Sequence, residues 1–106
     1  MSAGIKYDKD KPAPALVLHG FRNALLEVSK VATFGAEKYA EGNWEFVENG
    51  YKRYTNAMLR HYLSEHTATS KDPETGLLEA AHIAWNALAR LELLLKELQC
   101  DEKQKV

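Results

Sequence analysis

Hydrophobic side chains recur at spacings of three and four along much of the chain, which is typical of amphipathic helices. The first such stretch covers residues 20–39, and its apolar side consists of Phe21, Ala24, Leu25, Val28, Val31, Ala32 and Gly35. The second covers residues 51–66, with an apolar arc of Tyr51, Tyr54, Met58, Leu59 and Tyr62. The third covers residues 73–98 and is apolar on most sides. The pattern predicts an all-α domain with three main helices and no strand.

The third helix has a sharp start signal. Asp72 is suited to cap the helix, and Pro73 is suited to its first position. Glu74 would face the positive end of the helix dipole. We therefore expect this helix to begin directly after Asp72.

The segments outside the helices carry breaker residues and charges. The prolines and charges of residues 1–19 predict an extended N-terminal arm, and residues 99–106 predict a flexible tail. The Gly-Asn pair at 42–43 and the Asn-Gly pair at 49–50 predict turns. These segments and the helices form one domain that spans residues 1–106.

The third helix carries more apolar surface than two amphipathic neighbours can cover. Exposed patches of that size are uncommon on monomeric proteins. We expect a second copy of the chain to cover the remainder, so that a homo-oligomer, a dimer or a tetramer, completes a helical bundle. A monomer with an exposed apolar patch is the alternative.

Composition and charge narrow the class of protein. The 106 residues are 45% hydrophobic and 27% charged, which is a globular composition. Lys and Arg number 14 against 15 Asp and Glu, so the chain lacks the positive charge that drives binding to nucleic acids or acidic membranes. Cys100 is the only cysteine, which excludes an internal disulfide. With no apolar run of roughly 18 residues, we expect a cytoplasmic protein with no membrane or nucleic-acid partner. The basic residues Lys52, Arg53 and Arg60 leave DNA binding as an alternative.

Several common active-site motifs do not occur in the sequence. It has no glycine-rich phosphate loop, no Gly-x-Ser-x-Gly turn, no His-Glu-x-x-His motif and no His-Asp dipeptide. Carboxylates and histidines on helices remain. His61 and Glu65 lie four positions apart on one helix face, where they can hold a divalent cation or form a surface ion pair.

The third helix carries one narrow polar stripe, which consists of Glu79, His82, Asn86 and Arg90. The stripe either faces water or lines a polar cleft. In a cleft, Glu79 and His82 could bind a metal ion. Asn86 could then hydrogen-bond a base or a sugar, and Arg90 could hold a phosphate.

The acidic residues before the third helix also have two interpretations. Asp72 and Glu74 suit a helix start, and two carboxylates at such a place can also coordinate Mg²⁺, which prefers oxygen ligands. Lys11, Lys38 and Arg60 are candidate phosphate contacts, although most lysines are simply solvated.

A set of short motifs runs through residues 4–95. In order they are Gly4-Ile5-Lys6-Tyr7-Asp8, Lys11-Pro12, Phe34-Gly35-Ala36-Glu37-Lys38-Tyr39, Asn43-Trp44, Ala57-Met58-Leu59-Arg60-His61, Asp72-Pro73-Glu74-Thr75-Gly76-Leu77, and His82 with Asn86. This ordered set resembles the small phage and bacterial dATP/dGTP diphosphohydrolase family. That family is similar to the MazG-like all-α nucleoside triphosphate pyrophosphohydrolases.

The resemblance implies a MazG-like helical bundle and a reaction. A purine deoxynucleoside triphosphate, dGTP or dATP, would be cut between its α and β phosphates to give the monophosphate and pyrophosphate. Two or three Mg²⁺ or Mn²⁺ ions would bind the phosphates and activate a water. A role in phage nucleotide pools or modified-DNA synthesis, in the host cytoplasm, would follow. A non-catalytic helical module that binds a protein partner is the alternative.

The resemblance also suggests where the site residues lie. The candidate metal ligands are Glu37, Glu65, Asp72, Glu74, Glu79 and His82. The candidate catalytic residues are Asp72, Glu74 and His61. The candidate substrate contacts are Lys11, Lys38, Asn43, Trp44, Arg60 and Asn86, and Trp44 or Tyr39 could stack on the purine. The MazG-like motif Glu-Glu-x-x-Glu does not occur here, so the ligands are not assigned by the motif alone.

Overall fold

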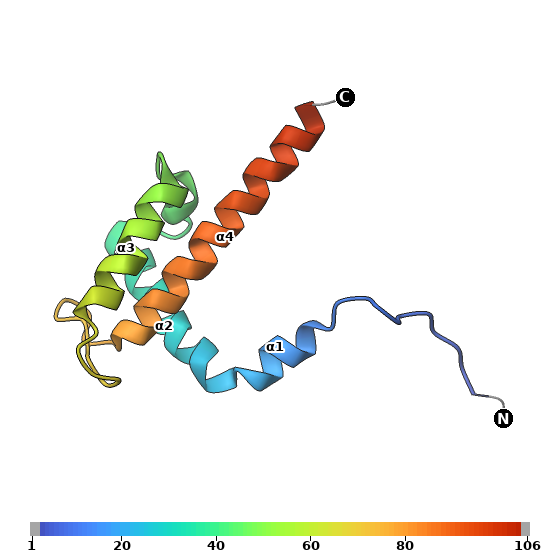
Figure 1. The fold of residues 1–106 in the computed structure, drawn as a ribbon, viewed down its shortest axis with the longest axis horizontal. Helices are drawn as coiled ribbons and strands as arrows, with labels where there is room; N and C mark the ends of the chain where they lie inside the picture. Colours follow the sequence, from blue (N-terminus) through green and yellow to red (C-terminus); the bar gives the residue numbers. More distant parts are fainter. Residues whose placement is uncertain (1–2, 105–106) are drawn as a thin grey trace.

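The computed structural model describes residues 3–104, and this part of the chain is helical with no named strand (Figure 1). The elements in order are α1 (Pro14–Gly20), α2 (Arg22–Tyr39), the 3-10 helix η1 (Asn43–Phe46), α3 (Gly50–Ser64) and α4 (Glu79–Gln104). An isolated antiparallel bridge joins Lys71 and Leu78 in the loop before α4. The predicted all-α fold is confirmed, and α2 and α3 lie within two residues of their predicted bounds.

Two of the predicted irregular segments are partly helical, and residues 3–13 of the predicted arm contain no helix. Residues 14–20 form α1, because Pro14 occupies a first helical position, where its fixed backbone angle and missing N–H are tolerated. The predicted tail over residues 99–106 is helical as far as Gln104, since α4 continues without a break. Residues 105 and 106 lie outside the described residues.

The predicted start of the third helix is wrong, because α4 begins at Glu79 and not at Pro73. The Asp72 side chain does accept a hydrogen bond from the backbone N–H of Thr75, at 2.9 Å. It closes only a single turn, which ends when Gly76 donates its N–H to the Asp72 carbonyl at 2.8 Å and takes a φ of 70°. Residues that cap helices also close turns, so the same signal fits both structures.

Replacing Gly76 with alanine is expected to lower the free energy of unfolding by about 1–2 kcal/mol, because L-residues are strained at positive φ. The matched control is Gly35→Ala in α2, where an added Cβ meets nothing within 4 Å. Alanine in a helix interior is expected to stabilise by roughly 0.5–1 kcal/mol. Urea unfolding of both variants measures the difference, and equal stabilities would contradict this account of the loop.

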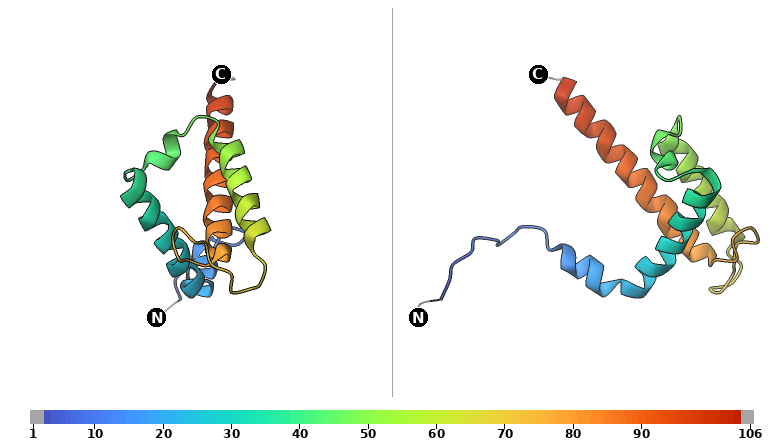
Figure 2. Two further views of the ribbon diagram at one scale, coloured as in Figure 1. Left: turned by 90° about the vertical axis from the view of Figure 1, so that its left-hand side faces the viewer. Right: turned by 180° about the vertical axis from the view of Figure 1, so that it is seen from behind.

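The helices pack around α4. The left view of Figure 2 shows α3 on one side of α4 and α2 on the other. The close approach of α3 to α4 depends on Gly50, because a Cβ at this position would lie 2.6 Å from Leu93 Cδ1. Trp44 of η1, Tyr54 of α3 and Trp85 of α4 pack edge to face, with ring centroids 5.5–6.4 Å apart. This aromatic cluster fixes the connection between α2 and α3. None of the helices in residues 3–104 has the length and hydrophobicity to span a membrane.

The chain is extended for its size. Its radius of gyration is 17.7 Å, whereas a compact domain of about 100 residues has a radius near 13 Å. Leu88, Leu91, Leu95 and Leu98 are 44–51% exposed and recur at spacings of three and four along α4. We call this set the leucine stripe. It lies on the helix face opposite Ala89 and Leu93, of which Ala89 is buried and Leu93 lies against α3.

Candidate functional site

A cavity of about 930 Å³ lies between α2, η1, α3, α4 and the loop before α4. Cationic side chains line it from two helices, Lys38 from α2 and Arg53 and Arg60 from α3. Aromatic side chains line it as well, including Trp44 and Trp85. The cavity therefore combines positive charge with flat apolar surfaces.

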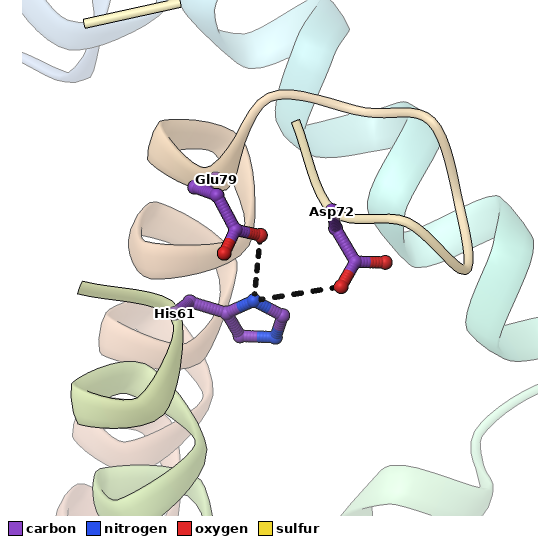
Figure 3. A group of neighbouring side chains, drawn as sticks. All are labelled: His61, Asp72 and Glu79. Atoms are coloured by element: carbon purple, nitrogen blue, oxygen red, sulfur yellow. Dashed lines mark hydrogen bonds and ion pairs between the residues drawn. The ribbon is translucent and has the colours of Figure 1, made fainter. Parts of the chain in front are cut away.

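Three potential metal ligands converge beside this cavity, as Figure 3 shows. His61 lies near the end of α3, Asp72 in the loop, and Glu79 at the first position of α4. The Nδ1 atom of His61 is 3.0 Å from Glu79 Oε1 and 4.0 Å from Asp72 Oδ1. One nitrogen and two oxygen donors thus lie within 4.8 Å of one another.

Glu79 is the most deeply buried charged residue of this cluster, with only 2% of its side chain exposed. A buried carboxylate is costly unless it is paired. His61 supplies a hydrogen-bond partner, and the N-terminus of α4 places the carboxylate at the positive end of the helix dipole. The fold therefore holds the Glu79 carboxyl group in a position that is nearly inaccessible to water.

Thr75 orients two residues of the site at once. Its backbone N–H and its hydroxyl donate to Asp72 Oδ2 at 2.9 and 3.0 Å. Its Oγ1 also lies 2.7 Å from Nε2 of His82. Partial burial tends to raise the pKa of Asp72, but the two hydrogen bonds from Thr75, with His82 and His61 nearby, outweigh it and lower the pKa. Asp72 is therefore held as a carboxylate.

His82 faces the same cluster from α4. It is buried, its Nε2 lies 3.8 Å from Asp72 Oδ2, and its ring stacks on His61 with centroids 4.3 Å apart. Burial, followed by the neighbouring His61, lowers the pKa of His82, and this exceeds the opposing effect of Asp72, Glu79 and Glu74. His82 is therefore neutral at pH 7, which is the form of imidazole that binds metal ions.

Replacing Thr75 with valine is expected to raise the pKa of Asp72 in metal-free protein, because a hydrogen bond to the carboxylate is lost. A lowered pKa stabilises the fold above the unfolded value of 3.8, and that contribution disappears as the pH falls through the folded pKa. The variant should therefore retain less of this stabilisation than the wild type. Carboxyl NMR titration measures the pKa. Thr75→Ser keeps the hydroxyl and serves as the control, and an unchanged pKa in Thr75→Val would contradict the assignment.

The polar stripe predicted on the third helix faces the interior of the molecule and not water. Glu79, His82 and Asn86 are all buried, and both His82 and Asn86 line the cavity. Nδ2 of Asn86 donates to the carbonyl of His82 at 2.8 Å. Arg90 lies apart from the cavity lining, and it hydrogen-bonds Thr55 at 2.8 Å and stacks on Tyr51, so that it joins α4 to α3.

The other acidic candidates are scattered. Glu74 and Glu37 line the cavity but lie outside the three-ligand cluster, and Glu74 forms an ion pair with Lys38. This pair bridges the loop and α2. Glu65 follows the end of α3 and belongs neither to the cavity lining nor to the cluster.

The candidate substrate contacts divide in a similar way. The ones that line the cavity are Lys38, Tyr39, Asn43, Trp44, Arg60 and Asn86. Lys11 is exposed in the N-terminal segment and does not line it. Trp44 both packs against Tyr54 and Trp85 and borders the cavity, so its two predicted roles are compatible.

Sequence reasoning missed Thr75, Tyr54 and Trp85. The spacing of Asp72 and Thr75 is a local turn signal, but the contact between Thr75 and His82 depends on the path of the whole loop. Tyr54 and Trp85 were part of apolar arcs, and only the packing of α3 on α4 turns them toward the cavity.

Comparison with known proteins identifies a family. The family model described as dATP/dGTP diphosphohydrolase, N-terminal, matches residues 1–103. No curated protein matches the chain, and no solved structure does so either. The matched range includes every residue of the cluster and of the cavity lining.

Proposed function

Because the chain belongs to the dATP/dGTP diphosphohydrolase family, described by its N-terminal model, we propose that it hydrolyses a purine deoxynucleoside triphosphate to the monophosphate and pyrophosphate. The observation that carries this proposal is the position of the His61, Asp72 and Glu79 cluster beside a cationic and aromatic cavity. A role in phage nucleotide pools or modified-DNA synthesis is part of the same proposal.

The cluster fits a divalent cation, because its nitrogen and oxygen donors converge and two of its three side chains are carboxyl groups. A bound cation would neutralise phosphate charge and favour deprotonation of the attacking water. In the chain itself, the Thr75 hydrogen bonds fix Asp72, and the hydrogen bond to Glu79 fixes His61. The ligands are therefore oriented before substrate arrives, which reduces the reorganisation needed for reaction.

Three cationic side chains of the cavity suit a triphosphate. Arg53 and Arg60 can offer paired N–H donors to phosphate oxygens. The hydrogen bond to Glu74 raises the pKa of Lys38, so its ammonium group stays charged at neutral pH. We propose that substrate phosphates replace Glu74 as the partner of Lys38.

The proposed reaction is an in-line displacement at the α phosphorus. The water oxygen forms a bond to that phosphorus while the bond to the bridging oxygen breaks, and the bridging oxygen leaves with pyrophosphate. The proton from the water needs an acceptor. Glu74 lines the cavity without belonging to the cluster, so it is free to take this proton once Lys38 turns to the phosphates.

The purine is proposed to lie on the aromatic side of the cavity. Trp44 and Tyr39 offer ring surfaces there, and Asn43 and Asn86 offer amides that can read the edge of a base. Because Asn86 is 5% exposed and held by the His82 carbonyl, its amide has a fixed orientation.

Hydrolysis in water enriched in ¹⁸O is expected to place the label in the deoxynucleoside monophosphate and not in pyrophosphate, because the water attacks the α phosphorus. The assay uses each dNTP and NTP with Mg²⁺, Mn²⁺, Co²⁺ or Zn²⁺, followed by chromatography and mass spectrometry. Label in pyrophosphate, or formation of a nucleoside diphosphate with orthophosphate, would contradict the reaction. Absence of turnover with every nucleotide and ion would favour the non-catalytic binding module.

We also propose that the protein is a homo-oligomer, with a second copy covering the leucine stripe. The spacing of Leu88, Leu91, Leu95 and Leu98 is that of the apolar seam in a coiled coil. The C-terminal half of α4 extends past α3, so the stripe is accessible to another helix (Figure 1). The many large hydrophobic side chains that are exposed in the single chain agree with burial of apolar surface between copies.

A further inference from the structure

We propose that the N-terminal segment of each copy packs on a second copy of the chain and places lysine side chains at the cavity of that copy. The segment consists of residues 3–13, which we call the arm, followed by α1. The inference rests on the proposed function for the identity of the ligand, a nucleoside triphosphate. It adds a second copy of the chain to the site.

α1 presents apolar side chains without a partner in the single chain. Every residue from 3 to 24 is exposed. Leu16, Val17 and Leu18 of α1 and the following Phe21 are 52–77% exposed. A helix of seven residues is too short to be stable in water through its own hydrogen bonds, so it depends on tertiary packing. Its apolar side chains therefore require a covering surface, which residues 3–104 of the same copy do not provide.

The arm leads away from the cavity of its own copy. Figure 1 and the right view of Figure 2 show it continuing from α1 on the side opposite α3 and the loop before α4. None of residues 3–13 belongs to the cavity lining. Residues 3–13 can span up to about 35–40 Å when fully extended, whereas the molecule measures 25 Å along its shortest axis. The arm is therefore long enough to reach a neighbouring copy.

The arm is also close to the proposed interface between copies. The C-terminal half of α4 carries the leucine stripe, and it extends beyond α3 toward the same side of the molecule as the arm (Figure 1). A second copy that covers the leucine stripe is thus within reach of the arm. The arm and the stripe can belong to one continuous interface, which α1 extends with further apolar side chains.

The arm offers lysines that are not engaged in ion pairs. It carries Lys6, Lys9 and Lys11 against Asp8 and Asp10, and none of these five takes part in the ion pairs of residues 3–104. In a turn of the arm, the N–H of Lys11 donates to the Asp8 carbonyl at 3.1 Å, which keeps Lys9 and Lys11 on the same turn. Lysine ammonium groups are good partners for phosphate oxygens.

The cavity supplies only part of the positive charge that a triphosphate requires. Three cationic side chains line it, but the acidic ones outnumber them and are Glu37, Glu41, Asp72 and Glu74. Glu37 and Glu41 are exposed and belong to none of the ion pairs described for the chain. A divalent cation offsets only part of the charge of the phosphates. The cavity is therefore complementary to the arm, because its exposed carboxylates and a bound triphosphate both attract lysines.

In the proposed arrangement, the apolar side chains of α1 anchor the segment on the second copy. The turn of the arm then lies at the opening of the cavity, where the ammonium groups of Lys9 and Lys11 donate to phosphate oxygens. Because closed symmetry makes the exchange reciprocal, each copy gives one arm and receives one. Residues of two copies thus hold the substrate of each site.

The first experiment detects the contact without any turnover. Unlabelled copies and copies labelled with ¹⁵N are mixed under conditions that allow subunit exchange, and a carbodiimide then joins lysines to neighbouring carboxylates. We expect linked peptides in which Lys9 or Lys11 is joined to Glu37 or Glu41 and in which the two peptides carry different isotopes. Links only between peptides of the same isotope would show that the arm folds back on its own cavity. That result, or the absence of these links, would overturn the proposal.

The second experiment measures the contribution to substrate binding. The double variant Lys9→Gln with Lys11→Gln is expected to raise KM for dGTP or dATP at least about tenfold, because charge-assisted hydrogen bonds to phosphate are lost. Lys30→Gln with Lys52→Gln is the matched control, since both positions are exposed and lie outside the cavity lining, and it should leave KM unchanged. An unchanged KM in the folded arm variant would contradict the proposal.

Mixing the arm variant with Glu79→Gln decides between the two copies. In a mixed pair, one copy supplies an intact cavity and the other an intact arm, so random pairing should restore about a quarter of the wild-type rate at low substrate concentration. An arm that acts on its own copy leaves every site defective and gives no restoration, which would overturn the proposal. Circular dichroism checks that each variant is folded.

These outcomes are distinguishable from a failure of the proposed function. Links between differently labelled copies without hydrolysis of any nucleotide would support the exchange of arms and reject the activity. Hydrolysis of dGTP or dATP by protein that shows only links within one copy, and no restoration on mixing, would support the activity and reject the exchange.

Discussion

Replacing Glu79 with glutamine is expected to lower the rate of dGTP or dATP hydrolysis by more than about a hundredfold while the helical content stays the same. Loss of a residue that only supports a metal ligand typically costs about 10- to 100-fold, and the loss of the ligand itself should cost more. The glutamine amide keeps the volume of the side chain and can still hydrogen-bond His61. Because it is neutral, it cannot balance the charge of a bound cation.

The experiment compares initial rates of pyrophosphate release at saturating metal and nucleotide. Glu92→Gln is the matched control, since Glu92 lies on α4 and is exposed, and it should retain the wild-type rate. A Glu79→Gln variant with more than about a tenth of the wild-type rate would show that the buried carboxylate serves packing and not catalysis.

Introducing charge into the leucine stripe is expected to dissociate the protein into monomers. In the double variant Leu91→Glu with Leu95→Glu, four leucines of the proposed interface between two copies are replaced by carboxylates. Each buried leucine contributes about 1.5–3 kcal/mol, so the dissociation constant should increase by at least about a thousandfold. Like charges facing each other across the interface add to the effect.

Sedimentation velocity at several protein concentrations measures this change. Lys52→Gln alters the net charge in the same direction as one Leu→Glu change, but on an exposed position of α3, and it should leave the oligomer intact. A wild-type protein that sediments as a monomer at micromolar concentration would contradict the proposed interface directly.

The helices that bury one face were the easiest to predict. In α2 and α3 the apolar positions alone define the element, because the period of 3.6 residues leaves no other regular structure. The loop before α4 was the hardest. Asp72, Pro73 and Glu74 satisfy the requirements of a helix start, and the positive φ of Gly76 is what turns this signal into a loop. Gly76 is visible in the sequence, but its backbone conformation, and hence the direction of the chain after it, is not.

Only part of the candidate site could be predicted from the sequence. Helical spacing placed Glu79, His82 and Asn86 on one face, and the structure shows that this face is buried. His61 was paired in the sequence with Glu65, four positions away, whereas the structure pairs it with Glu79, eighteen positions away. Local spacing cannot reveal such a contact, because it depends on how α3 and α4 are docked.

Of the three donors of the cluster, His61 lies in the last turn of α3, Asp72 lies in the loop that links α3 to α4, and Glu79 is the first residue of α4. An ion or ligand that binds all three donor atoms acts on this loop as a covalent cross-link would, because it removes open conformations from the chain. The free energy of binding at the cluster then stabilises the closed conformation of the loop. Backbone amides of residues 65–78 should therefore exchange their hydrogens with solvent more slowly as the fraction of ligand-bound cluster increases. Occupancy of the site then also determines how often the loop opens.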